Sequence, residues 1–439
     1  MRTLLLSALL SITASAQPTL PSLDALMADS LSQIGGGAAL LVIQDGVVVH
    51  RAGYGTFTPE TVEATASGAK WLAGSVIASL LSDGTLTLDD SLAMFFPALE
   101  GPKRSITVRQ LFSHTSGFRG NEVSPESGCV SNPITTLERC TETILDFPLV
   151  SEPGTEFRYG GYSMQVAGRV AEIATGVSWT QLFADRITTP LGMTQTAYMR
   201  SRNPRVAGGT VTTVDDYGAF LEMVLNRGVY RGRRILTEEA VDAMLGDQTD
   251  GAEIVYSPFT QYDQLNLGIP PSRDIRYGLG VWREQIALDG SLLIGSSPGA
   301  FGMGPWIDVS LGTVGVLLVR DRGPNVIPTY VELQRRVREA LGWQGTSGST
   351  GPSAGAQLEI WPNPADTHVQ VSYALRQPVE ADLTVFDLLG RRVRHLDLGE
   401  RVAGTHRTTL TTGGLPSGTY LLRLSAGGAT TTHPLTIRR

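Results

Sequence analysis

The sequence has little lysine, histidine and cysteine, and it has no excess of positive charge. Lysine and arginine together number 35 against 42 acidic residues, and only Lys70 and Lys103 are lysines. The formal net charge of −7 argues against a nucleic-acid-binding protein, which requires a clustered basic surface. Six histidines and two cysteines form no group with the ligand spacing of a zinc site. We therefore expect neither a metal nor another cofactor.

Long apolar runs are also missing, since no stretch approaches the roughly 18 residues that a membrane-spanning helix needs. The N-terminus instead combines Arg2, a short apolar stretch at residues 4–13 and the small residues Ala-Ser-Ala at 14–16. This order is typical of a secretory signal peptide. We predict that residues 1–16 are such a signal, with an ordinary N-terminal helix as the alternative.

The two cysteines, Cys129 and Cys140, lie in one segment that is rich in Gly, Pro and Ser. Export to an oxidising compartment would favour a disulfide between them, closing a short loop. Two free, buried thiols are the alternative.

The composition supports a packed core, because 41% of the residues are hydrophobic and 18% are charged. Residues 344–356 read QGTSGSTGPSAGA, a composition typical of a flexible linker. Short alternating apolar runs separated by turn residues follow at 357–439 and predict a small β-sandwich. We therefore predict a signal peptide at 1–16, a main domain at 17–343, a linker at 344–356 and a separate all-β domain at 357–439.

The main domain mixes the two kinds of secondary structure. Apolar runs on both sides of Asp45-Gly46 predict a β-hairpin at 39–50. Helical spacing and end signals predict helices at 66–82, 162–175, 214–226, 237–246 and 327–342. Further strands are expected at 277–287, 292–296, 303–309 and 313–320. Because strands occur at both ends with helices between them, we expect an α/β (α+β) fold whose antiparallel sheet is flanked by helices.

A Ser-x-x-Lys pattern, Ser67 to Lys70, stands at the start of a predicted helix. Residues three apart on a helix share one face, so the two side chains can touch. A serine hydroxyl becomes a good nucleophile only when a neighbouring base removes its proton. Lysine can serve as that base from its neutral form, whereas arginine stays charged in proteins. A lysine here is informative because this chain uses arginine at almost every other basic position.

A second serine pattern competes, because residues 295–299 read Gly-Ser-Ser-Pro-Gly and match the nucleophile elbow Gly-x-Ser-x-Gly. The elbow needs the backbone N–H after its serine, Ser297, and Pro298 has none. No histidine follows before residue 344 to complete a triad. Catalysis through His114 has no supporting spacing either, and we expect that histidine to hold a turn.

Six segments now point to one family: SGAKW (67–71), DGTLTLDDSL (83–92), VRQLFSHTSGF (108–118), PGTEFRYGGYSMQVAGRVAEIATG (153–176), PLGM (190–193) and SSPGAFGMGPWID (296–308). In this order they resemble the serine β-lactamase-related family, which includes class C β-lactamases, D-Ala carboxypeptidases and esterases. The resemblance implies a helical subdomain set against an α/β sheet domain, with the active site between them. It also implies that Ser67 is the acylated nucleophile, Lys70 its base and Tyr159 a partner in proton transfer. A buried structural tyrosine is the alternative for Tyr159.

The same resemblance places the third motif at Ser297 to Gly299 and the oxyanion hole at the backbone N–H groups of Ser67 and Ala300. Two departures stand out. Gly161 replaces the usual asparagine of the second motif, and Ser297 replaces a cation that would bind a substrate carboxylate. These changes favour a small neutral ester or amide over β-lactams and D-Ala peptides. A non-catalytic surface protein that binds ligands with the same fold is the second hypothesis.

The tail carries its own resemblance, through WPNPADTHVQVSYAL (361–375), LTVFDLLGRRV (383–393) and LPSGTYLLRL (415–424). These segments resemble the type A sorting domain of the type IX secretion system. The resemblance implies that the secretion machinery is a partner and that the protein is released or attached to the cell surface. A carbohydrate-binding or adhesive β-module is the alternative.

Overall fold

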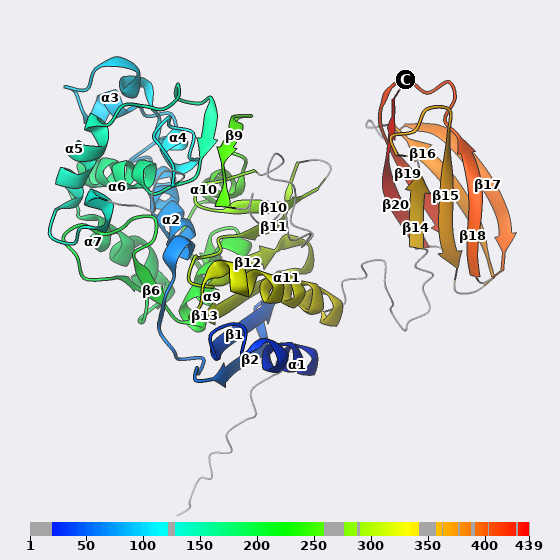
Figure 1. The fold of residues 1–439 in the computed structure, drawn as a ribbon, viewed down its shortest axis with the longest axis horizontal. Coiled ribbons are helices and arrows are strands. Elements are labelled where there is room, and N and C mark those ends of the chain that lie inside the picture. Colours follow the sequence, from blue (N-terminus) through cyan, green and yellow to red (C-terminus); the bar gives the residue numbers. More distant parts are fainter. Residues whose placement is uncertain are drawn as a thin grey trace, which may run out of the picture. The chain divides into compact units, whose positions relative to one another are not determined.

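The structure, a computed structural model, describes residues 20–121, 128–258, 276–287, 290–341, 357–361, 363–375, 378–387, 391–402, 404–426 and 429–438. The chain divides into two compact units, Met1–Arg336 and Val337–Arg439 (Figure 1). The predicted signal peptide and the predicted linker lie outside the described residues. The domain boundaries drawn from the sequence stay predictions.

The first unit contains a six-stranded antiparallel sheet in the order β10-β11-β12-β13-β1-β2. Its strands are β1 (Gly37–Gln44), β2 (Val47–Gly55), β10 (Trp282–Ile286), β11 (Leu292–Ser296), β12 (Gly304–Asp308) and β13 (Thr313–Val319). Strand β1 pairs with β13, so that Leu41 lies opposite Val316. Segments from the two ends of the unit therefore form one sheet, as the sequence predicted.

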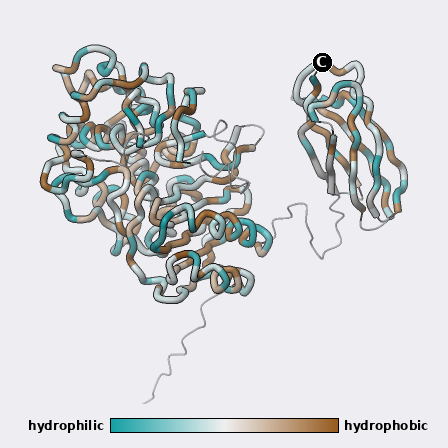
Figure 2. The backbone as a smooth tube through the Cα atoms, in the orientation of Figure 1, coloured by the Kyte–Doolittle hydropathy of each residue, from teal (hydrophilic) through white to brown (hydrophobic). Residues whose placement is uncertain are grey.

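Strands β13 and β1, in the interior of the sheet, are covered on both faces. Every residue of β13 and all of β1 except Gln44 are buried, and Figure 2 shows the apolar colouring of this part of the chain. Such unbroken apolar runs are typical of strands without a solvent-facing side. One face packs into the main core with α2 (Ala69–Ser82) and α9 (Val214–Leu225). On the other face Tyr330, from α11 (Gly323–Ala340), packs edge-on against Trp306 of β12.

The chain between β2 and β10 is mostly helical. It contains η1 (Ala66–Gly68), α2, α3 (Leu92–Phe95), η2 (Gly101–Ser105), α4 (Val108–Phe112), η3 (Cys129–Ser131), α5 (Leu137–Asp146), α6 (Tyr162–Thr175), α7 (Trp179–Phe183), η4 (Ala184–Thr188), α8 (Thr189–Leu191), α9 and α10 (Glu238–Leu245). Short strands also occur here: β3 (Glu63–Ala64), β4 (Glu156–Arg158), β5 (Ala197–Tyr198), β6 (Thr210–Thr212), β7 (Val229–Tyr230), β8 (Arg233–Arg234) and β9 (Glu253–Tyr256). Helix α1 (Pro21–Ser30) precedes the sheet.

Helix starts in this region follow a common local rule. Helices α4, α5, α9 and α10 each begin after a threonine whose hydroxyl accepts a hydrogen bond from a backbone N–H in the first turn. Such N-caps satisfy a donor that the helix itself cannot pair. The two predicted helices at 214–226 and 237–246 accordingly begin within one residue of their predicted starts.

Two predicted elements differ from the structure. The strand expected at 277–287 is regular only from Trp282, because Gly280 before it has a φ of +84°, in the left-handed region that favours glycine. The helix expected at 327–342 begins earlier, at Gly323, and carries Pro328 in its first turns. Pro328 lacks a backbone N–H to donate within the helix, yet the helix continues through it.

Cys129 and Cys140 form a disulfide with Cα atoms 5.1 Å apart, which confirms the predicted pairing. The bond ties η3 to helix α5 across 11 residues. For a loop of this length the chain-entropy relation predicts a stabilisation of about 2–3 kcal/mol.

We expect the double variant Cys129→Ser/Cys140→Ser to lose about 2–3 kcal/mol of unfolding free energy, measured by urea denaturation of the oxidised wild type and the variant. In the presence of reductant, the unfolding free energy of the wild type should approach that of the variant. Equal stability of the two proteins under oxidising conditions would contradict this role of the disulfide.

From Gln357 onward, the regular elements of the described residues are strands, in two antiparallel sheets of order β14-β15-β18 and β17-β16-β19-β20. The strands are β14 (Gln357–Trp361), β15 (His368–Leu375), β16 (Val379–Phe386), β17 (Arg392–Arg401), β18 (Gly404–Thr411), β19 (Gly418–Ala426) and β20 (Ala429–Ile437). Val369 and Val371 of one sheet share a core with Leu383 and Leu422 of the other. The predicted all-β domain is confirmed. In the described parts of both units, no helix has the length and apolar character needed to cross a bilayer.

Candidate active site

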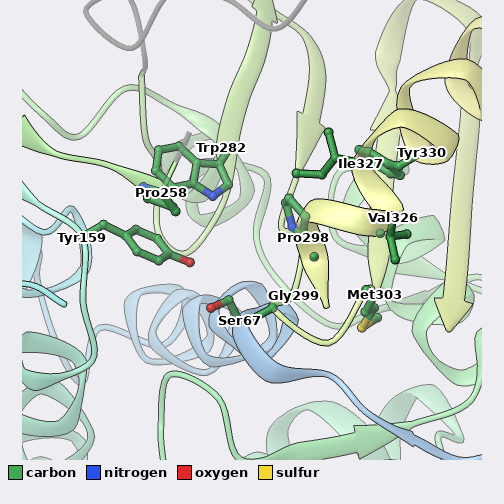
Figure 3. Close-up of a pocket in the computed structure, with 14 residues that line it drawn as sticks. Ser67, Tyr159, Pro258, Trp282, Pro298, Gly299, Met303, Val326, Ile327 and Tyr330 are labelled. Carbon is green, nitrogen blue, oxygen red and sulfur yellow. The ribbon is translucent and has the colours of Figure 1, made fainter. Parts of the chain in front are cut away.

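Ser67 lies in the short helix η1, directly before α2, and it lines a pocket together with Tyr159 (Figure 3). Ala66, the residue before it, has a φ of +45°, a conformation that costs an L-residue roughly 1–2 kcal/mol. The buried Tyr217 hydroxyl donates a hydrogen bond to the carbonyl oxygen of Gly68 at 2.7 Å. Burial holds the pKa of Tyr217 well above its usual range, so this phenol remains a donor. The hydrogen bond from Tyr217 thus stabilises the turn that contains Ser67.

Lys70 lies one helical turn after Ser67 and points back at it. Its Nζ atom lies 3.2 Å from the Oγ of Ser67 and 3.0 Å from the carbonyl oxygen of Ala207. The side chain is 1% exposed. A buried amine needs such polar partners, and the Tyr159 ring lies against it, with its centroid 4.6 Å from Nζ. The sequence brought Ser67 and Lys70 together by spacing, and the structure places them within hydrogen-bond distance.

Tyr159 follows strand β4, and its backbone N–H donates to the carbonyl oxygen of Tyr256 at 3.1 Å. Its ring stacks on that of Trp282, with centroids 5.0 Å apart and an interplanar angle of 29°. In Figure 3 the phenol hydroxyl points toward Ser67. Aromatic packing therefore fixes a hydroxyl beside the serine and the lysine.

His114 lies behind Tyr159, with ring centroids 4.7 Å apart. It is buried, its φ is +60°, and its carbonyl oxygen accepts the N–H of Arg158 at 2.9 Å. Burial first, and the charge of Lys70 second, hold its pKa well below the usual range. A neutral His114 adds no second positive charge beside Lys70. The sequence predicted a turn-holding role, and the structure adds the contact with Tyr159.

Ser297 closes the site from the side of the sheet. Its hydroxyl lies 3.2 Å from the carbonyl oxygen of Ser67 and 3.0 Å from that of Gly280, so it donates to the backbone. A Cβ atom at Gly299 would lie 2.1 Å from the carbonyl oxygen of Thr65, so only glycine allows this approach. The third-motif segment and the Ser67 segment are thus packed backbone to backbone. Because the Ser297 hydroxyl donates to backbone carbonyl oxygens, it is poorly suited to act as the nucleophile of the nucleophile-elbow alternative.

Ala300 belongs to a tightly tied loop beside Ser67. Its carbonyl oxygen accepts the N–H of Gly323, the first residue of α11, at 2.9 Å, and the N–H of Gly299 donates to the carbonyl oxygen of Met303 at 2.8 Å. Ser67 and Ala300 both line the pocket. These bonds fix the backbone where the sequence predicted the second oxyanion donor.

The pocket has a volume of about 100 Å³. Its remaining lining is largely apolar and, in the part of the chain that is described, carries no charged side chain: Pro258, Trp282, Pro298, Gly299, Ala300, Gly302, Met303, Gly304, Gly323, Val326, Ile327 and Tyr330. Sequence reasoning identified neither Trp282 nor the α11 residues as part of the site. Nothing in their local pattern marks them, because each reads as an ordinary core residue of a strand or a helix.

Comparison with known families assigns both units. A family profile described as Beta-lactamase matches residues 23–353, and one described as Secretion system C-terminal sorting domain matches residues 359–438. The chain therefore belongs to the β-lactamase family, whose members of this type are serine hydrolases. Its C-terminal sorting domain indicates export through a secretion system to the cell surface or the medium.

Individual relatives cover several activities. The chain is 29% identical over 274 residues to lovastatin esterase of Penicillium rubens, covering 49% of this chain and 68% of the esterase. It is 30% identical over 180 residues to the D-alanyl-D-alanine-carboxypeptidase/endopeptidase AmpH of Escherichia coli K12, covering 38% of this chain and 46% of AmpH. A crystal structure from Bacteroides dorei, provisionally assigned as a β-lactamase, matches with 32% identity and a TM-score of 0.64, covering 72% of this chain and 98% of that one.

Two further curated relatives are covered over less than half of their length. The matches to Protein flp of Staphylococcus aureus and to penicillin-binding protein 4 of Amycolatopsis lactamdurans span 35% and 44% of those proteins. The structure of EstCE1, a hydrolase with promiscuous acyltransferase activity, shares the fold at 19% identity and a TM-score of 0.58, covering 73% of this chain and 97% of that one.

Proposed function

We propose that this protein is an exported serine hydrolase that acts through an acyl-enzyme on Ser67 and cleaves a small, uncharged ester or amide. The observation that carries the proposal is the contact of 3.2 Å between Lys70 Nζ and Ser67 Oγ. It is supported by the Tyr159 hydroxyl, which points at the same serine (Figure 3). The esterase and peptidase relatives are consistent with this reaction class.

In the first half-reaction, Lys70 in its neutral form takes the proton of Ser67 while Oγ bonds to the substrate carbonyl carbon. The negative charge that develops on the carbonyl oxygen is stabilised by the N–H groups of Ser67 and Ala300. Tyr159 relays a proton from Lys70 to the leaving group as the bond to that group breaks. In the second half-reaction, water attacks the acyl-enzyme ester on Ser67. Tyr159 and Lys70 accept the proton of the water and return a proton to Ser67 Oγ as the acid product leaves.

The preference for an uncharged substrate is supported by the lining of the pocket. A substrate carboxylate would meet no Lys, Arg or His side chain among the residues that line the described pocket. Burying an unpaired carboxylate is costly. The hydroxyl of Ser297, at the position of the family's cation, is directed at two backbone carbonyls.

The test is turnover on a panel of p-nitrophenyl esters, nitrocefin and a D-Ala-D-Ala peptide. We expect ester hydrolysis to exceed hydrolysis of the other two substrates. Dominant nitrocefin or D-Ala turnover would establish the β-lactamase or peptidase alternative. Turnover of none of them above the Ser67→Ala background would favour the non-catalytic binding protein.

Tyr159→Phe removes one hydroxyl and keeps the ring that packs on Trp282 and His114. We expect kcat on p-nitrophenyl butyrate to fall by about 10²–10⁴-fold, the usual contribution of a proton-transfer group, with an unchanged melting temperature. Tyr256→Phe is the matched control, since it removes a phenol hydroxyl from the segment that pairs with Tyr159. Wild-type kcat in Tyr159→Phe would show that this phenol is structural.

A further inference from the structure

One wall of the pocket is formed by the first turns of helix α11. Val326, Ile327 and Tyr330 line the pocket from this helix, and Met303 lines it from the loop that precedes strand β12. Their exposed fractions are 3%, 7%, 5% and 1%. In Figure 3 Val326, Tyr330 and Met303 lie on the opposite side of Ser67 from Tyr159. The lining on this side of the nucleophile is therefore formed mainly by apolar side chains.

The wall is rigidly built. A Cβ atom at Gly304 would lie 2.4 Å from the ring of Tyr330, so α11 rests directly on the backbone of β12. The Tyr330 hydroxyl accepts a hydrogen bond from Gln334 at 2.8 Å, and its ring packs against Trp306. The bond from the Gly323 N–H to the Ala300 carbonyl oxygen joins the same helix to the loop beside Ser67. A wall held in this way cannot collapse into the pocket, which leaves a preformed apolar surface.

The wall is also uncharged. Burial raises the pKa of the Tyr330 phenol well above its usual range, so its hydroxyl carries no charge at neutral pH. Helix α11 does contain charged residues, but the pairs that Glu332 forms with Arg335 and Arg336 lie beyond the part of the helix that lines the pocket. A group bound against the wall gains from burying carbon and loses by carrying charge.

We propose that Val326, Ile327, Tyr330 and Met303 form a specificity subsite that binds an aliphatic chain next to the scissile ester bond, so that the substrate is an uncharged aliphatic ester of several carbons. This inference rests on the proposed function and assigns the part of the substrate that the function leaves open. The aliphatic chain of the substrate belongs either to its acyl group or to its alcohol. Both kinds of chain would make the same apolar contacts with the wall.

The experiment measures kcat/KM over two ester series. One lengthens the acyl group from p-nitrophenyl acetate to hexanoate, and the other lengthens the alcohol from methyl to hexyl butyrate. We expect kcat/KM to rise by about fourfold per methylene in one series, and the series that responds identifies the bound side. Mono-p-nitrophenyl succinate, which has a terminal carboxylate, should be cleaved at least about 100-fold more slowly than p-nitrophenyl butyrate.

Val326→Ala and Ile327→Ala should flatten the responding series toward a constant kcat/KM. Val337→Ala is the matched control, because it removes the same two methyl groups from a buried position on α11 outside the pocket lining. It should preserve the wild-type slope. The slope is a ratio within one variant, so a loss of folded protein does not alter it.

The subsite would be overturned if kcat/KM of the wild type did not change with chain length in either series. It would also be overturned if Val326→Ala and Ile327→Ala kept the wild-type dependence of kcat/KM on chain length. Turnover that depends on Ser67 would still support the proposed function in that case. Absence of Ser67-dependent turnover on every ester would instead overturn the function itself.

Discussion

Replacing Ser67 by alanine is expected to reduce ester hydrolysis by at least about a thousandfold. The reason is that the substitution removes the atom that forms the acyl-enzyme, and loss of a nucleophile in a serine hydrolase costs about 10⁶-fold in a well-studied case. The Ser67 backbone N–H is retained, so a weak residual activity from oxyanion stabilisation is compatible with the account. The measurement is kcat/KM on p-nitrophenyl butyrate.

The matched control is Ser297→Ala, which removes the hydroxyl of the competing serine pattern. That hydroxyl donates to the carbonyl oxygens of Ser67 and Gly280, so we expect a smaller loss than for Ser67→Ala. The reverse order, with Ser297→Ala inactive and Ser67→Ala active, would restore the nucleophile-elbow interpretation.

Lys70→Arg is expected to lower kcat by about 10²–10⁴-fold although it keeps a basic side chain at this position. An arginine cannot give up its proton in a protein, so it cannot serve as the base for Ser67. The other lysine offers a matched control: Lys103→Arg makes the same chemical change at a side chain that donates to the carbonyl oxygen of Leu145 at 2.5 Å. We expect that variant to retain wild-type kcat.

The larger guanidinium could also disturb the buried site, because Lys70 is 1% exposed. Lys70→Met, which is similar in length and uncharged, separates the two effects. We expect it to fold with a melting temperature near that of the wild type and to be as inactive as Lys70→Arg. A folded Lys70→Met variant with wild-type kcat would show that the amine is not the base.

The sequence predicted the elements of this fold where local signals were strong. Strand β11 and helix α6 have the predicted bounds, and the two-sheet tail follows from alternating apolar residues such as Val369 and Val371. Predictions failed where local rules conflicted with tertiary packing. Helix α11 begins four residues before its predicted start at residue 327, and Gly280 shortened the strand before Trp282.

The residues of the site also fall into those that local sequence patterns predict and those that they do not. The proximity of Ser67 and Lys70 follows from spacing on one helix, because one turn separates them. Tyr159 could be placed only through the family resemblance, since it lies 92 positions after Ser67 in the sequence. Val326 and Ile327 have no motif, and they reach the site only because α11 folds back onto β12. Their role depends on packing, which no local pattern in the sequence records.

The most direct test of the central claim is to map the residue that a fluorophosphonate probe modifies, using peptide mass spectrometry on the intact wild-type chain. We predict one adduct, on the peptide that contains Ser67, and its loss in Ser67→Ala and strong reduction in Lys70→Met. An adduct on Ser297, or no adduct on a folded protein that hydrolyses esters, would contradict the account.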